Sequence, residues 1–122
     1  MRHRLKDQSR TAALARLSLR NACLARAAEK PSEAVRWAVL AAQRFETGVK
    51  DGTCNRDVCM DATEAVLLLL DLKHPDRGGG AASWKECAAR ALRWADKHTK
   101  GMSPEEVTRL AELQKRVTAL IP

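Results

Sequence analysis

Apolar residues recur at steps of three and four in five separate stretches of the chain, and Pro or Gly lies between successive stretches. Steps of three and four place residues on one face of an α-helix, whereas a half-buried strand needs strict alternation. Alanine and leucine dominate the apolar residues, while Tyr is absent and Phe occurs once, which disfavours sheet. A length of 122 residues fits one domain. We therefore predict an all-α fold, in which residues 1–122 form a single-domain bundle of about five amphipathic helices.

Capping residues and helix breakers set the expected helix boundaries. Ser32, Ser83 and Ser103 suit N-caps, and the last two are followed by Glu86 and Glu106 at the spacing of a capping box. We expect Gly48 to help end the second helix. Because the connections are short, neighbouring helices should run roughly antiparallel. The expected helices cover about residues 8–29, 32–49, 55–73, 83–100 and 103–121.

The same spacing predicts which faces are buried. The segment from Val58 to Leu72 is apolar on nearly all sides, so we expect it to be the most buried helix. In the first helix the inward face is predicted to comprise Leu14, Leu17, Asn21, Leu24 and Ala28. In the fifth helix it comprises Val107, Leu110, Leu113, Val117, Leu120 and Ile121.

Positive charge is concentrated in two parts of the chain. The net charge is +7; residues 1–30 hold eight Lys and Arg against two acids, and residues 81–100 hold five against two. On the first helix the basic residues project away from the predicted core, and on the fourth they recur at steps of three and four. Cations at helical spacing suit phosphate contacts. The predicted nucleic-acid-binding residues are Arg16, Arg20, Arg26, Lys30, Arg90, Arg93, Trp94, Lys97 and Lys100.

Trp94 lies one turn from Arg90, where it could stack on a base; a partly buried core position is the alternative. No stripe of aromatic residues or helix-turn-helix pattern is present for reading base sequence. In size, helicity and charge the chain resembles the small helical subunits of CRISPR effector complexes. That resemblance implies a non-enzymatic subunit that contacts an RNA or DNA backbone and other protein subunits within a ribonucleoprotein assembly.

The tripeptide His74-Pro75-Asp76, with Arg77 and the glycines after it, resembles the loop between two helices of J-domain co-chaperones. The resemblance covers roughly residues 57–98 and implies an Hsp70 partner. In that family the preceding helix is basic, whereas Asp61, Glu64 and Asp71 make it acidic here. We therefore interpret the tripeptide as a helix-terminating loop. A protein-interaction adaptor, either a degenerate J-domain-like co-chaperone or a phage inhibitor protein, is the alternative function.

The four cysteines favour free thiols over a disulfide framework, because the chain begins with no secretory signal. A reducing cytoplasm is the expected compartment. Cys54 and Cys59 have the spacing of one zinc-ligand pair, but no second pair follows, so no metal is predicted. We expect Cys23, Cys59 and Cys87 to be small core residues.

Neither catalysis nor a membrane span is predicted. The glycines at 78–80 lack the Lys and Ser or Thr of a phosphate-binding loop. Asp57, Asp61 and Glu64 share helical spacing and could hold a metal, but such acids more often interact with the helix dipole. The longest apolar run, Ala65 to Leu70, is too short for a membrane span.

Overall fold

The described part of the chain is entirely helical apart from its connections. The computed structural model describes residues 2–75 and 83–120, with side chains from Ser9 onward. Five helices that share one hydrophobic core confirm the predicted all-α bundle. They are α1 (Arg2–Ala27), α2 (Pro31–Asp51), α3 (Arg56–Asp71), α4 (Trp84–Asp96) and α5 (Pro104–Thr118).

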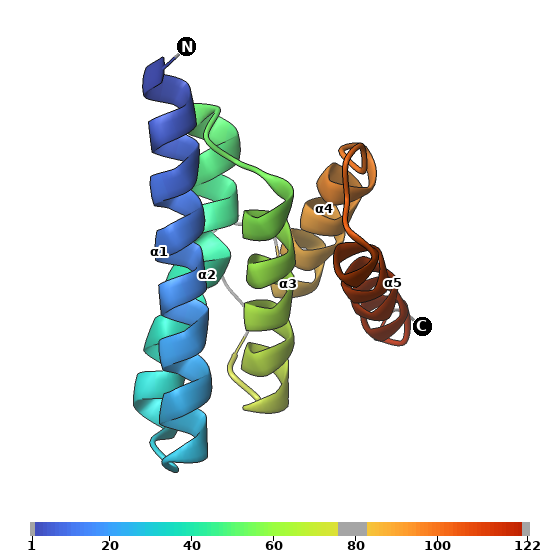
Figure 1. Cartoon of the computed structure of the whole chain (residues 1–122). Coiled ribbons are helices and arrows are strands. Elements are labelled where there is room, and N and C mark those ends of the chain that lie inside the picture. Colours follow the sequence, from blue (N-terminus) through green and yellow to red (C-terminus); the bar gives the residue numbers. More distant parts are fainter. Residues whose placement is uncertain (1, 76–82, 121–122) are drawn as a thin grey trace.

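Helix α3 is the centre of the bundle. In Figure 1, α1 and α2 run alongside each other on one side of α3, while α4 and α5 lie on the other side. Helix α3 contacts each of the other four helices, which explains why a nearly all-round apolar helix is needed there. Val58, Met60, Val66 and Leu69 are fully buried, as predicted for this segment.

The first helix faces inward with a different set of residues from those predicted. Leu17 is 53% exposed and Leu24 is 61% exposed, and Ala28 is exposed as well. Small side chains let α1 approach the alanine-rich face of α2 closely, and this seam leaves the leucines outside. The buried residues of α1 are Ala15, Ser18, Leu19, Ala22 and Ala25, and those of α2 are Ala34, Ala38, Ala41, Ala42, Phe45 and Gly48.

Several predicted boundaries and faces also change. Helix α2 begins at Pro31, so Ser32 lies in its first turn rather than at its N-cap. Gly48 is inside α2, where it lets the backbone of Cys54 pass 3.2 Å from the position that a Cβ would occupy. Helix α4 ends at Asp96, which removes Lys100 from its face. Val107 is 53% exposed, and Ile121 lies outside the described residues.

Side-chain caps begin three of the helices, and residues with positive φ follow two of them. Asn55 Oδ1 accepts a hydrogen bond from the Val58 amide over 2.9 Å, and the Ser83 side chain accepts one from the Glu86 amide. At α5, Ser103 and Glu106 form the complete capping box that the sequence predicts. Glu29 and Lys73 adopt positive φ after α1 and α3, a conformation in which glycine is normally favoured.

Candidate nucleic-acid interface

The exposed cations of α4 form the largest part of the candidate interface. Trp84, Cys87, Ala91 and Ala95 are buried against the core. Since these residues fix the rotation of the helix, the opposite face points into solvent. Arg90, Arg93 and Lys97 lie on that face at steps of three and four, are exposed, and make no ion pair within the described residues. These three guanidinium and ammonium groups are therefore available to an anion.

Two acids reduce the positive charge of this face. Glu86 is exposed one turn before Arg90, and Asp96 is exposed beside Lys97. Asp96 Oδ1 accepts a hydrogen bond from Gln114 of α5 over 3.4 Å. Arg93 lines a shallow groove of about 210 Å³ between α4 and α5, together with Leu92 and Val117. The net charge of the α4 face is positive but modest.

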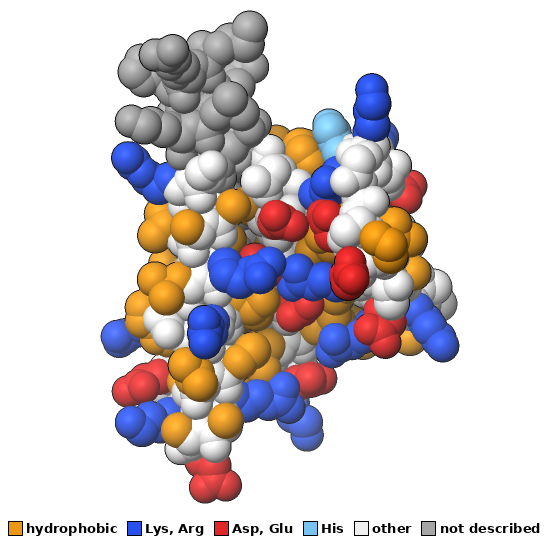
Figure 2. All heavy atoms as spheres, viewed as in Figure 1, with side chains coloured by type: hydrophobic (Ala, Val, Ile, Leu, Met, Phe, Trp, Pro, Cys, Tyr) orange, Lys and Arg blue, Asp and Glu red, His pale blue; other side chains and the backbone are white. Residues whose placement is uncertain are grey.

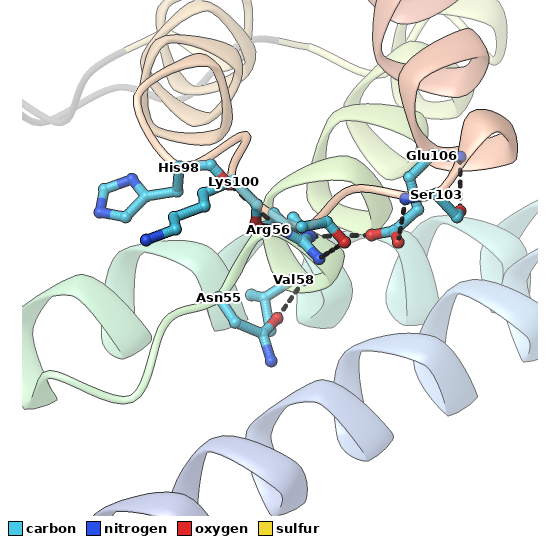
Figure 3. Close-up of polar contacts among 8 residues, drawn as sticks. Asn55, Arg56, Val58, His98, Lys100, Ser103 and Glu106 are labelled. Atoms are coloured by element: carbon cyan, nitrogen blue, oxygen red, sulfur yellow. Dashed lines mark hydrogen bonds and ion pairs between the residues drawn. The ribbon is translucent and has the colours of Figure 1, made fainter.

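The turn after α4 is held in place by Arg56, the first residue of α3. Its guanidinium donates hydrogen bonds to the backbone oxygens of His98, Lys100 and Gly101, the shortest being 2.7 Å to Lys100. Its Nε donates to Glu106 Oε2 over 2.8 Å. Figure 3 shows this arrangement, in which the His98 and Lys100 side chains point the same way, away from Arg56. A fixed backbone thus presents Lys100 beside the C-terminal end of α4.

Trp94 is half-buried, and one face of its ring is already covered. The Trp94 and His98 rings are stacked with centroids 3.6 Å apart and planes 11° apart. His98 Nδ1 also lies 2.7 Å from the Trp94 carbonyl oxygen, which fixes the imidazole in this position. A nucleic-acid base cannot stack on the face of Trp94 that His98 covers. On this side a base would meet the His98 ring, which is not among the residues predicted from helical spacing.

The basic residues of α1 are used differently from those of α4. Arg16 Nε contacts the Asp61 carboxylate over 3.3 Å, and Arg26 Nη1 contacts Asp71 over 3.4 Å. Arg20 and Lys30 are exposed and form no ion pair in the described residues. Of the four basic residues predicted from this part of the chain, Arg16 and Arg26 therefore join α1 to α3, while Lys30 lies beyond α1, at the N-cap of α2.

The two predicted basic faces are also separated in space. Within the described residues, α1 makes no contact with α4, because α3 lies between them (Figure 1). The structure therefore brings Arg90, Arg93, Lys97 and Lys100 together but does not join them to Arg20 or Lys30.

The acidic residues of α3 are occupied by arginines. Arg109 of α5 donates to Asp61 and to Glu64, both over 2.7 Å. Burial lowers the pKa of Arg109, but the hydrogen bond to Asp61 and the charge of Glu64 outweigh this and raise it. The described residues contain no group of three His, Cys, Asp or Glu side chains that could hold a metal. Asp61 and Glu64 thus form ion pairs with Arg109, in addition to any interaction with the dipole of α3.

The cysteines divide into one exposed and three buried thiols. Cys23 is exposed, contrary to the prediction, whereas Cys54, Cys59 and Cys87 are buried, and none of the four cysteines forms a disulfide. The sulfur atoms of Cys54 and Cys59 are 3.5 Å apart. The hydrogen bond with Cys54, together with burial, raises the pKa of Cys59 well above its ordinary value. The Cys59 side chain is therefore a neutral core thiol.

The His74-Pro75-Asp76 segment begins where α3 ends. The His74 amide donates to the Leu69 carbonyl over 3.0 Å, which closes the helix end around Lys73. Asp76 and the glycines lie outside the described residues.

Comparisons of the chain with protein-family models, with curated proteins and with solved structures found no match. In the described part of the chain, the helices are too short or too polar to span a bilayer.

Proposed function

We propose that this chain is a non-enzymatic, cytoplasmic subunit that contacts the phosphate backbone of RNA or DNA within a ribonucleoprotein assembly. The observation that carries the proposal is the row of exposed cations formed by Arg90 and Arg93 on α4 and Lys97 at its C-cap, none of which forms an ion pair in the described residues. Phosphate contact needs cations at a regular spacing and no base-reading groups. Lys100 extends the row onto the turn that Arg56 holds.

Fluorescence anisotropy with short labelled RNA and DNA across a salt series tests the proposal. We expect affinity to fall steeply with salt and to depend little on base sequence. Changing Arg90, Arg93 and Lys97 together to Ala should weaken binding of all sequences alike and lower the salt slope by about two to three units.

A matched variant controls for the loss of charge. Changing Arg36, Lys50 and Arg116 to Ala removes the same number of exposed cations from α2 and α5. This variant should keep most of the affinity. Equal losses in both triple variants would mean that net charge, rather than the α4 face, accounts for binding. Absence of binding to RNA and DNA at low salt, with the protein folded by circular dichroism, would reject the proposal.

The second candidate function is that of a protein-interaction adaptor. The observation that favours it is the exposure of Leu17 and Leu24 on α1, since leucines gathered on one exposed face are typical of a protein-binding surface. A failure to bind nucleic acid would not argue against the adaptor function, because the exposed leucines lie on α1 and the row of cations lies on α4 and at its C-cap.

A further inference from the structure

The outer face of the α1–α2 pair exposes more large apolar side chains than any other described face. Leu17 and Leu24 of α1 are 53% and 61% exposed, and Leu40 of α2 is 37% exposed. Leu14 and Trp37 are half-buried beside them. Figure 2 shows hydrophobic side chains along α1, on the left of the view, with Lys and Arg side chains among them. We call Leu14, Leu17, Leu24, Trp37 and Leu40 the apolar face.

The apolar face cannot be covered by the rest of the described chain. Arg16 and Arg26 reach from α1 to α3, so α3 lies on their side of α1. Leu17 and Leu24 project on the side of α1 away from α3, because successive residues of a helix are rotated by about 100°. The small residues that face α2 occupy the remaining side of α1. No described helix of this bundle therefore covers the side chains of Leu17 and Leu24.

A groove runs along part of the apolar face. It has a volume of about 380 Å³ and is open to solvent. Leu24 of α1, Ala28 just after α1 and Trp37 of α2 supply its apolar walls, and Asn21, Lys30 and Glu33 supply polar groups at its edges. An open groove between two helices matches the shape of a third helix, which can place one apolar side chain per turn into it.

Arginines flank the leucines, and acids do not. Arg20 lies one turn from both Leu17 and Leu24, while Arg36 and Arg44 lie one turn before and after Leu40. No Asp or Glu lies three or four residues from any of these three leucines. The acid nearest the groove is Glu33, which lies at its edge one turn before Trp37, and Glu29 and Asp51 lie further from the three leucines.

From this combination we infer that the apolar face binds an acidic amphipathic helix of a protein partner. The partner's apolar stripe fills the groove beside Leu24 and Trp37, and its Asp and Glu residues lie opposite Arg20, Arg36 and Arg44. A second copy of this chain is a poorer occupant. Face-to-face packing about a two-fold axis would gather the arginines of both copies around one apolar centre without acids. This inference uses different helices from the proposed nucleic-acid interface, so each can fail alone.

The test uses the full chain and synthetic helical peptides of about 20 residues, long enough to follow the α1–α2 face. The first peptide carries Leu at steps of three and four with Glu on both flanks. The second replaces every Glu by Lys, and the third keeps the composition of the first but disrupts the Leu spacing. Anisotropy of labelled peptides should show binding of the first peptide and little binding of the other two.

Two variants place the binding on the apolar face. Changing Leu17 and Leu24 to Gln should weaken binding of the first peptide by at least about tenfold, because two anchor side chains are lost. Changing Arg20, Arg36 and Arg44 to Gln should weaken it and reduce the preference for the Glu peptide over the Lys peptide. Val107→Gln is the matched control because Val107 is equally exposed but lies on α5, and it should leave binding unchanged.

Four results would overturn the inference. The first is absence of binding, and the second is equal binding of the Glu and Lys peptides. The third is self-association in analytical ultracentrifugation that disappears in the Leu17 and Leu24 variant, since this would identify a second copy as the occupant. The last concerns a different ligand: the wild type binds anionic vesicles or nucleic acid but not the first peptide. In that case the variant with Leu17 and Leu24 changed to Gln would bind none of them.

Discussion

Arg109 of α5 and Asp61 of α3 form an ion pair of 2.7 Å around a carboxylate that is only 1% exposed. Arg16 of α1 reaches the other oxygen of the same carboxylate over 3.3 Å. One buried carboxylate therefore joins helices from both ends of the chain to the central helix. Removing its charge would leave two guanidinium groups without the anion that they share, and breaking a buried ion pair is costly.

We expect Asp61→Asn to lower the free energy of unfolding by about 2–3 kcal/mol, because both arginines are partly exposed and solvent screens part of the loss. Glu64→Gln is the matched control, since Glu64 binds Arg109 but is 33% exposed, and it should cost under about 1 kcal/mol. Urea unfolding followed by circular dichroism measures both. Similar losses for the two variants would show that the burial of Asp61 is energetically unimportant.

The Glu106 carboxylate should make stability depend on pH in acid. The hydrogen bond from the Ser103 amide, aided by Arg56, lowers the pKa of Glu106. A lowered folded-state pKa stabilises the protein above the unfolded value of about 4.3, and this stabilisation is lost as the pH falls through the folded-state pKa. The stability difference between wild type and Glu106→Gln should therefore shrink below about pH 4. Thermal unfolding across pH 2–7 measures it, and Arg56→Gln should weaken the dependence; a constant difference would contradict the prediction.

Lys73 should be replaceable by glycine with a gain in stability. Its φ of 55° lies in the left-handed region, where a residue with a Cβ is strained by about 1 kcal/mol. We expect Lys73→Gly to raise the free energy of unfolding by up to about 1 kcal/mol. Lys97→Gly is the control, because Lys97 caps α4 with a φ of −81° and should gain nothing. If Lys73→Gly instead lowered the free energy of unfolding, this would argue against a left-handed conformation of Lys73 after α3.

Gly48 should not tolerate a methyl group, although it lies inside a helix. A Cβ there would stand 3.2 Å from the Cα and N atoms of Cys54, which is tied to the Gly48 carbonyl by its own amide. The close contact is with backbone, so we expect Gly48→Ala to lower the melting temperature despite the better helix propensity of Ala. Thr47→Ala, at the exposed neighbouring position, should have little effect. A higher melting temperature for Gly48→Ala would show that the α2–α3 loop can move away.

The helices and caps could be predicted because their signals are local. Ser103, Pro104 and Glu106 lie within four positions, and they cap α5 as expected. The inward face of α1 could not be predicted in this way, since ranking by hydrophobicity selects Leu17 and Leu24 over Ala15 and Ala22. At most of these positions the bundle instead buries small side chains, because α1 and α2 approach closely, although Leu19 and Phe45 are buried as well.

The candidate interface could be predicted only in part, because some of its residues act through contacts that are distant in the sequence. The step of three and four residues identified Arg90, Arg93 and Lys97, but Arg56 and His98 carry no local signal of their roles. Arg56 acts on backbone carbonyls more than 40 positions away. Contacts over such separations depend on how α3 meets the α4–α5 turn, which periodicity does not specify.

The alanine-rich seam between α1 and α2 has a consequence for how the chain folds. An alanine buries one methyl group where a leucine buries four carbon atoms, so the seam gains little hydrophobic free energy for the backbone it orders. We expect the first two helices to be too weakly paired to persist as a hairpin, with productive folding beginning when the large side chains of α3 reach them. A nascent chain would then remain largely unstructured until its third helix had emerged from the ribosome.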